Sequence, residues 1–160
     1  MFSLERMRFA GVRLLSVLLA CVSCAVGCGP RPTYPPENTQ VVVLLSRDRK
    51  TGRFDAFEIR DKAMIERLKS AMNQDLCGPD PFDGGSVGLL VCHLLAFRSA
   101  SGDIVVYNIL GDTAIVSNSS HRSAGNTLAA LKVARFQGEA VAISRKRMGS
   151  LVPDFRGLEP

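Results

Sequence analysis

The side chains best suited to catalysis by type and order are a serine in a glycine-rich stretch and the aspartate and histidine that follow it. Residues 84–88 read Gly-Gly-Ser-Val-Gly, which satisfies the G-x-S-x-G pattern of a nucleophilic Ser86. Asp112 and His121 follow in the order of a Ser–Asp–His triad. The pattern requires a strand before the serine and a helix after it, but a Pro/Gly-rich stretch precedes Ser86 and an apolar, strand-like run follows. We therefore predict a flexible loop, with a hydrolase that uses Ser86 or His93 as the alternative.

A second pair of reactive side chains is Cys92 and His93, which are adjacent in the chain. Successive strand residues point to opposite faces of a sheet, so the two cannot form a thiolate–imidazole dyad within one strand. His93 instead shares its face with Val91, Leu95 and Phe97, which predicts a structural histidine. The chain has two histidines and no paired ligand spacing, so no zinc site is predicted.

Three aspartates, Asp75, Asp80 and Asp83, offer carboxylate oxygens of the kind that calcium prefers. Their spacing differs from that of an EF-hand loop, and aspartates beside Pro and Gly are typical of turns without an ion. The net charge of +5 is dispersed along the chain, which disfavours nucleic acid as a partner. The chain has no tryptophan for a carbohydrate platform. We predict no metal, no cofactor and no catalytic set.

The N-terminus has the three parts of an export signal. Arginines form a basic start, residues 14–27 contain no charge, and small residues directly precede Cys28. The uncharged run is too short for a membrane span, which needs about 20 apolar residues. We therefore predict that residues 1–27 are a signal peptide.

Residues 25–28 read Ala-Val-Gly-Cys and resemble the lipobox of bacterial lipoproteins, which the type II signal peptidase reads. The resemblance implies cleavage before Cys28, a diacylglycerol on its thiol and a further acyl chain, such as palmitate, on its amine. Two or more acyl chains hold a protein stably on a membrane, which implies a lipid-anchored, extracytoplasmic protein of the cell envelope. Gly29 favours the outer membrane where one exists. Two alternatives stay open: a lipobox that ends at Cys21, and ordinary secretion with cleavage after Ala25.

Two cysteines remain in the mature chain, Cys77 and Cys92. An even number of cysteines in an exported chain predicts a disulfide bond, which would close the loop between them. Closing a loop of about 15 residues stabilises a protein by about 3 kcal/mol on the chain-entropy model. The alternative is a free Cys92 in the core and an unpaired Cys77 in the loop.

The mature chain begins with a proline-rich stretch and a predicted β-hairpin. Residues 28–38 are rich in proline and contain no aliphatic side chain, which is typical of an extended tether. Two strand-like runs joined by a polar turn follow at 41–45 and 54–59. Asp61 is a suitable N-cap for a helix over 61–73, because the apolar residues of that range form one stripe.

The second half of the chain predicts an antiparallel meander of three strands, at 87–98, 104–110 and 113–117. The remaining segments are predicted as a polar loop at 119–125, a short helix that Asn126 caps and Gly138 closes, a short strand at 140–143, a basic strand end at 145–147 and a loose tail at 153–160.

This order of elements predicts an α+β fold with a single domain over residues 39–152. Its sheet is mainly antiparallel, covered by one clear amphipathic helix and a second, shorter one. The pattern is similar to that of small modules in many bacterial lipoproteins, a likeness that carries no functional motif. We predict a non-catalytic, membrane-anchored module that binds an envelope protein or the cell wall. Its predicted contact surface is the sheet face opposite the 61–73 helix, because the central strand is apolar on both faces.

Overall fold

A computed structural model describes residues 33–48, 50–79, 91–111, 113–117, 120–153 and 155 of the chain. The strands within these ranges are β1 (Thr39–Arg47), β2 (Phe54–Ile59), β3 (Val91–Ser99), β4 (Ile104–Leu110), β5 (Ala114–Ser117), β6 (Ser120–Ser123) and β7 (Val141–Ala142). The helices are α2 (Lys62–Leu76), α3 (Gly125–Phe136) and α4 (Arg145–Leu151).

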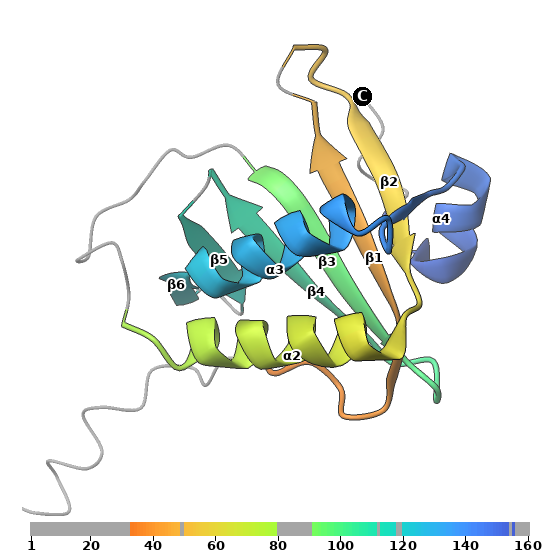
Figure 1. Ribbon diagram of the computed structural model, residues 1–160. Coiled ribbons are helices and arrows are strands. Elements are labelled where there is room, and N and C mark those ends of the chain that lie inside the picture. The colour runs from red at the N-terminus through yellow and green to blue at the C-terminus, as the bar shows by residue number, and fades with distance from the viewer. Residues whose placement is uncertain are drawn as a thin grey trace, which may run out of the picture. The chain divides into compact units, whose positions relative to one another are not determined.

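The strands form one open antiparallel sheet in the order β6-β5-β4-β3-β1-β2-β7. Helices α2 and α3 lie across one face of this sheet, and α4 packs at the other side beside β1 and β2 (Figure 1). The predicted α+β class with a mainly antiparallel sheet is confirmed. The predicted hairpin is β1–β2, and β3 is the central strand of the sheet.

The turn of the β1–β2 hairpin forms for local reasons. The carboxylate of Asp48 accepts hydrogen bonds from the backbone N–H groups of Lys50 (2.7 Å) and Thr51 (3.3 Å). Gly52 has a φ of 69°, a left-handed conformation that glycine adopts without steric cost. These two features reverse the chain between the strands.

Helix α2 begins where its N-cap predicts. The carboxylate of Asp61 accepts a hydrogen bond from the backbone N–H of Met64 at 2.7 Å. The predicted apolar stripe of the helix is buried: Met64, Ile65, Leu68, Ala71 and Met72. The helix continues to Leu76, beyond the predicted end, because Asp75 and Leu76 are also buried.

The sheet separates two hydrophobic cores. The larger one lies beneath α2 and α3 and contains a perpendicular contact of Phe97 with Tyr107, whose ring centroids are 5.7 Å apart. The smaller one joins alternate residues of β1, β2 and β3 to Leu151, Val152 and Phe155. Both faces of the central sheet are therefore packed, as the apolar β3 requires.

Helix α3 differs from the prediction at its start. The expected loop at 119–125 contains β6, which adds a fourth strand to the meander. The helix begins at Gly125, so Asn126 lies inside it rather than at its cap, and Ala124 supplies no side-chain bond. The cap comes from α2 instead. The buried carboxylate of Asp75 accepts hydrogen bonds from the backbone N–H groups of Asn126 (3.2 Å) and Thr127 (2.8 Å), and from the Asn126 side chain (2.8 Å).

The basic residues at 145–147 were expected to end a strand, and this was wrong, because they form the first turn of α4. Ser144 caps the helix by accepting a hydrogen bond from the backbone N–H of Arg147 at 3.3 Å. The Arg147 guanidinium donates to both carboxylate oxygens of Glu58 at 3.3 Å, and Arg60 pairs with the same carboxylate. The start of the predicted tail is packed as well, because Phe155 is buried in the smaller core.

We expect Asp75→Ala to lower the free energy of unfolding by about 3 kcal/mol. The substitution removes the acceptor of three N–H groups. The backbone N–H of Thr127 is buried, so it would lose its hydrogen bond without gaining one to water. Denaturant unfolding of the mature chain measures the effect. The matched control is Asp55→Ala on β2, where the side chain is exposed and the expected change is within about 0.5 kcal/mol. Equal losses in the two variants would contradict the capping role.

The Glu58 carboxylate makes the attachment of α4 sensitive to acid. Burial alone would raise the pKa of Glu58, but the hydrogen bonds and charges of Arg147 and Arg60 outweigh it and lower the pKa. A lowered folded-state pKa stabilises the protein above the unfolded-state value of about 4.3, and this stabilisation is lost as the pH falls through the folded-state pKa. The difference in unfolding free energy between wild type and Glu58→Gln should therefore shrink from pH 7 to pH 3. The exposed Glu37→Gln control should show no comparable trend; a pH-independent Glu58→Gln difference would refute the assignment.

Candidate functional site

The part of the predicted tether that the structure describes is fastened to the domain. Residues 33–38, which we call the docking segment, run along α2 before entering β1 (Figure 1). The Tyr107 hydroxyl, at the edge of the larger core, donates a hydrogen bond to the backbone carbonyl of Thr33 at 2.6 Å. Burial raises the pKa of Tyr107 well above its usual range, so this hydroxyl remains a donor. Pro35 is buried against the domain. The described part of the predicted tether, residues 33–38, therefore contacts the domain.

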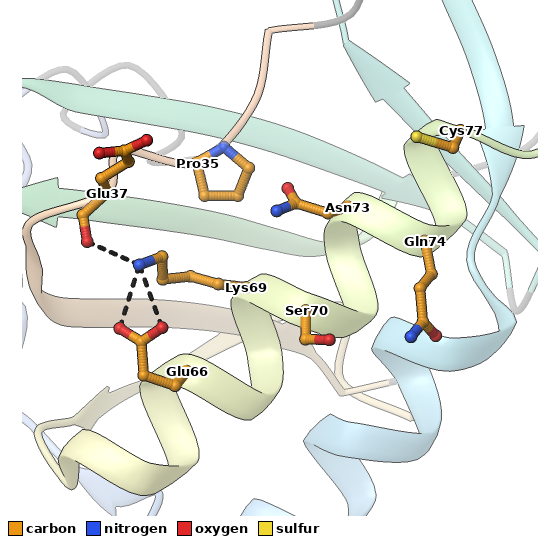
Figure 2. Close-up of a pocket in the computed structure, with 8 residues that line it drawn as sticks. All are labelled: Pro35, Glu37, Glu66, Lys69, Ser70, Asn73, Gln74 and Cys77. Carbon is orange, nitrogen blue, oxygen red and sulfur yellow. Dashed lines mark hydrogen bonds and ion pairs between the residues drawn. The ribbon is translucent and has the colours of Figure 1, made fainter.

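A groove of about 530 Å³ lies between the docking segment and α2 (Figure 2). Its walls come from Pro35, Glu37, Glu66, Lys69, Ser70, Asn73, Gln74 and Cys77. The Lys69 ammonium donates to the backbone carbonyl of Glu37 at 2.6 Å and to the Glu66 carboxylate at 3.0 and 3.2 Å. Lys69 thus joins the segment to the helix. At the other end, the Tyr34 hydroxyl lies 3.5 Å from the Cys77 sulfur.

A second cavity, of about 540 Å³, lies between α3 and the sheet. The residues that line it are Leu44, His93, Gly125, Leu128, Ala129, Leu131, Lys132 and Arg135. The described lining therefore combines leucines with two cations and contains no carboxylate. The Arg135 guanidinium also lies 4.8 Å from the ring centroid of Phe57.

The two histidines lie on opposite faces of the sheet. His93 is opposite Ile109 on β4, and it faces the cavity under α3 with the larger core. His121 is paired with Val116 on β5. The neighbouring Ile115 lies in the larger core, so Val116 and His121 are on the opposite face of the sheet. The structure therefore does not bring them together. Ser86 and Asp112, with which a triad would be completed, lie outside the described residues.

The predicted disulfide partners are both free thiols in the structure. Cys77 is exposed at the end of α2, and Cys92 is half-buried where the pairing of β3 with β4 shifts register. A bulge turns neighbouring residues away from strict alternation, so the predicted opposition of Cys92 and His93 does not follow from register alone. The bond between Cys77 and Cys92 stays a prediction, as do the lipidation of Cys28 and its alternative at Cys21, which lie outside the described residues.

Asp75, one of the three candidate calcium ligands, accepts hydrogen bonds at the N-terminus of α3. Asp80 and Asp83 lie outside the described part of the chain. Within that part, no group of three or more His, Cys, Asp or Glu side chains is arranged to hold a metal ion. No helix in the same residues combines the length and the apolar character needed to cross a membrane.

Large hydrophobic side chains are exposed at four described positions, which are Phe136 (93%), Val141 (60%), Tyr34 (46%) and Val106 (37%). The predicted contact surface opposite α2 is partly covered, because α4 and the residues after it pack over β1, β2 and β3. Two exposed large hydrophobic residues lie on this face among those described, Val106 on β4 and Val141 on β7, which is paired with Glu58. The most exposed apolar side chain, Phe136, lies instead at the end of α3.

Sequence reasoning missed the docking segment, although a signal was present. Tyr34 and Pro35 stand among its polar residues, and both side chains can pack without an aliphatic neighbour. In comparisons with known proteins, no family model, no curated protein and no solved structure matches this chain. Functional conclusions therefore rest on the chain itself.

We expect Tyr107→Phe to release the first residues of the docking segment at a cost of about 1 kcal/mol in unfolding free energy. The variant keeps the ring in the core and removes only the hydroxyl that binds the Thr33 carbonyl. Hydrogen exchange of a peptide covering 33–38 should become faster. The control Tyr34→Phe removes a more exposed hydroxyl and should have a smaller effect. Unchanged exchange in Tyr107→Phe would show that this bond does not hold the segment.

Proposed function

We propose that the protein is a lipid-anchored lipoprotein of the bacterial cell envelope, whose α+β domain acts by binding rather than by catalysis. Acylation of Cys28 is the anchor, and the partner is an envelope protein or the cell wall. The observation that carries the proposal is the docking segment. The chain that follows the lipobox is fastened to the domain from Thr33 onward, so only residues 29–32 separate the proposed anchor from the first described contact.

The contacts of the docking segment suit an anchored protein. A hydrogen bond from a buried tyrosine, an ammonium that bridges Glu37 and Glu66, and a buried Pro35 attach the segment at several points. The backbone N–H of Ala100 adds a bond to the Asn38 carbonyl at 3.1 Å. With these contacts, the stretch left between the proposed anchor and the domain is shorter than a free tether over 28–38 would be.

The outward surface of the domain is the place for a partner. The sheet face opposite α2 and α3 carries Val106 beside the region that α4 covers, and α4 adds the exposed cations Arg145 and Lys146. A non-obligate protein interface is about as apolar as the rest of a protein surface, so a face of mixed apolar and charged residues is compatible with one. The hydrolase alternative uses Ser86 or His93. Ser86 lies outside the described residues, and the described lining of the cavity that contains His93 adds Lys132 and Arg135 but no carboxylate.

The anchor is tested by growing cells with a palmitate analogue that carries an alkyne and detecting the label on the protein. Wild type and Cys21→Ser should be labelled equally, because Cys21 leaves with the signal peptide. Cys28→Ser should lose the label by at least tenfold, since no acyl acceptor remains. Label that persists in Cys28→Ser and disappears in Cys21→Ser would overturn the assignment of the anchor.

A further inference from the structure

Helices α2 and α3 cover one face of the sheet, and we call them the helix layer. Their exposed side combines one large aromatic side chain with several cations. Phe136 at the end of α3 is 93% exposed, although burial of a phenylalanine is strongly favourable in water. Lys132 and Arg135 lie on the same helix and are also exposed, at the mouth of the cavity that they line between α3 and the sheet, where Arg135 also contacts the Phe57 ring. Helix α3 has no acidic residue between Gly125 and Phe136. This composition is typical of a surface that meets an apolar phase bounded by negative charge.

Helix α2 extends the same cationic surface. It lies next to α3 on the same face of the sheet (Figure 1). Its exposed residues include Lys62 and Arg67. The exposed carboxylate of α2, Glu66, is neutralised by its ion pair with Lys69. The exposed side of the two helices therefore presents a net positive charge.

The chain enters the domain beside α2, a short distance in sequence after the proposed anchor. The docking segment runs along α2, so the chain enters the domain at the helix layer. Cys28 precedes Thr33 by five residues, and an extended chain spans at most about 3.6 Å per residue. An acylated Cys28 is then within about 18 Å of Thr33, less than two helix diameters.

We propose that the helix layer rests on the membrane, with Phe136 in the interfacial region and Lys132 and Arg135 at the phosphates of anionic lipids. The proposal rests on the lipid anchor of the proposed function and names the surface that the anchor holds down. It leaves the opposite face of the sheet, with Val106, directed away from the bilayer and open to a partner.

The absence of tryptophan from the chain makes a direct test simple, because one introduced tryptophan is the only such reporter. Acylated Phe136→Trp and Val106→Trp proteins are reconstituted into vesicles of phosphatidylglycerol and phosphatidylcholine, with and without brominated phosphatidylcholine. Bromine quenches indole fluorescence at short range. We expect quenching at position 136 at least threefold stronger than at position 106, which lies on the other sheet face. Equal quenching, or stronger quenching of Val106→Trp, overturns the proposal.

Charge reversal separates the role of the cations from that of the anchor. In the Phe136→Trp background, Lys132→Glu with Arg135→Glu should reduce the quenching at least twofold. The control Lys50→Glu with Lys146→Glu makes the same charge change at exposed positions outside the helix layer and should leave it unchanged. Co-sedimentation with vesicles reports the anchor independently. Protein that sediments without quenching at position 136 refutes the orientation alone, and protein that fails to sediment refutes the anchor and the orientation with it.

Discussion

The carboxylate of Asp75 is the interaction on which the arrangement of the helix layer depends. It is 2% exposed, and it receives three N–H bonds at the start of α3, where unpaired N–H groups and the helix dipole favour a negative charge. Burying a charge is costly unless it is fully hydrogen-bonded, so α3 can begin only where it meets the end of α2. Asp75 thereby holds the start of the helix that lines the cavity with His93 and ends at the exposed Phe136.

The docking segment joins the start of the described chain to the core of the domain. Tyr107 is part of the larger core through its contact with Phe97, and its hydroxyl reaches the Thr33 carbonyl, so the same residue packs the sheet and holds the incoming chain. Lys69 holds the same segment from α2, because its ammonium donates to the Glu37 carbonyl and to the Glu66 carboxylate. A lipid anchor on Cys28 would thus be attached to the core of the domain through a few residues.

Local sequence signals correctly predicted several elements of the fold. The Asp61 cap, the apolar stripe of α2, the turn that Asp48 builds and the apolar central strand β3 depend on residues close in sequence. The parts that could not be predicted depend on contacts distant in sequence. Asp75 caps a helix that begins about 50 residues later, and α4 exists where a strand end was expected because Glu58 binds Arg147. The docking segment was missed for the same reason. The hydrogen bond between Tyr107 and Thr33 joins residues far apart in sequence, and neither stretch of sequence indicates it.

The central claim is that the mature chain begins at an acylated Cys28, five residues before the first described contact with the domain. Mass spectrometry of the N-terminal peptide, from protein extracted from its native membranes, tests this most directly. The account predicts a peptide that begins at Cys28 and carries the mass of a diacylglycerol, with or without a further acyl chain on the amine. An unmodified N-terminus at Val26, or acyl chains on Cys21, would contradict it.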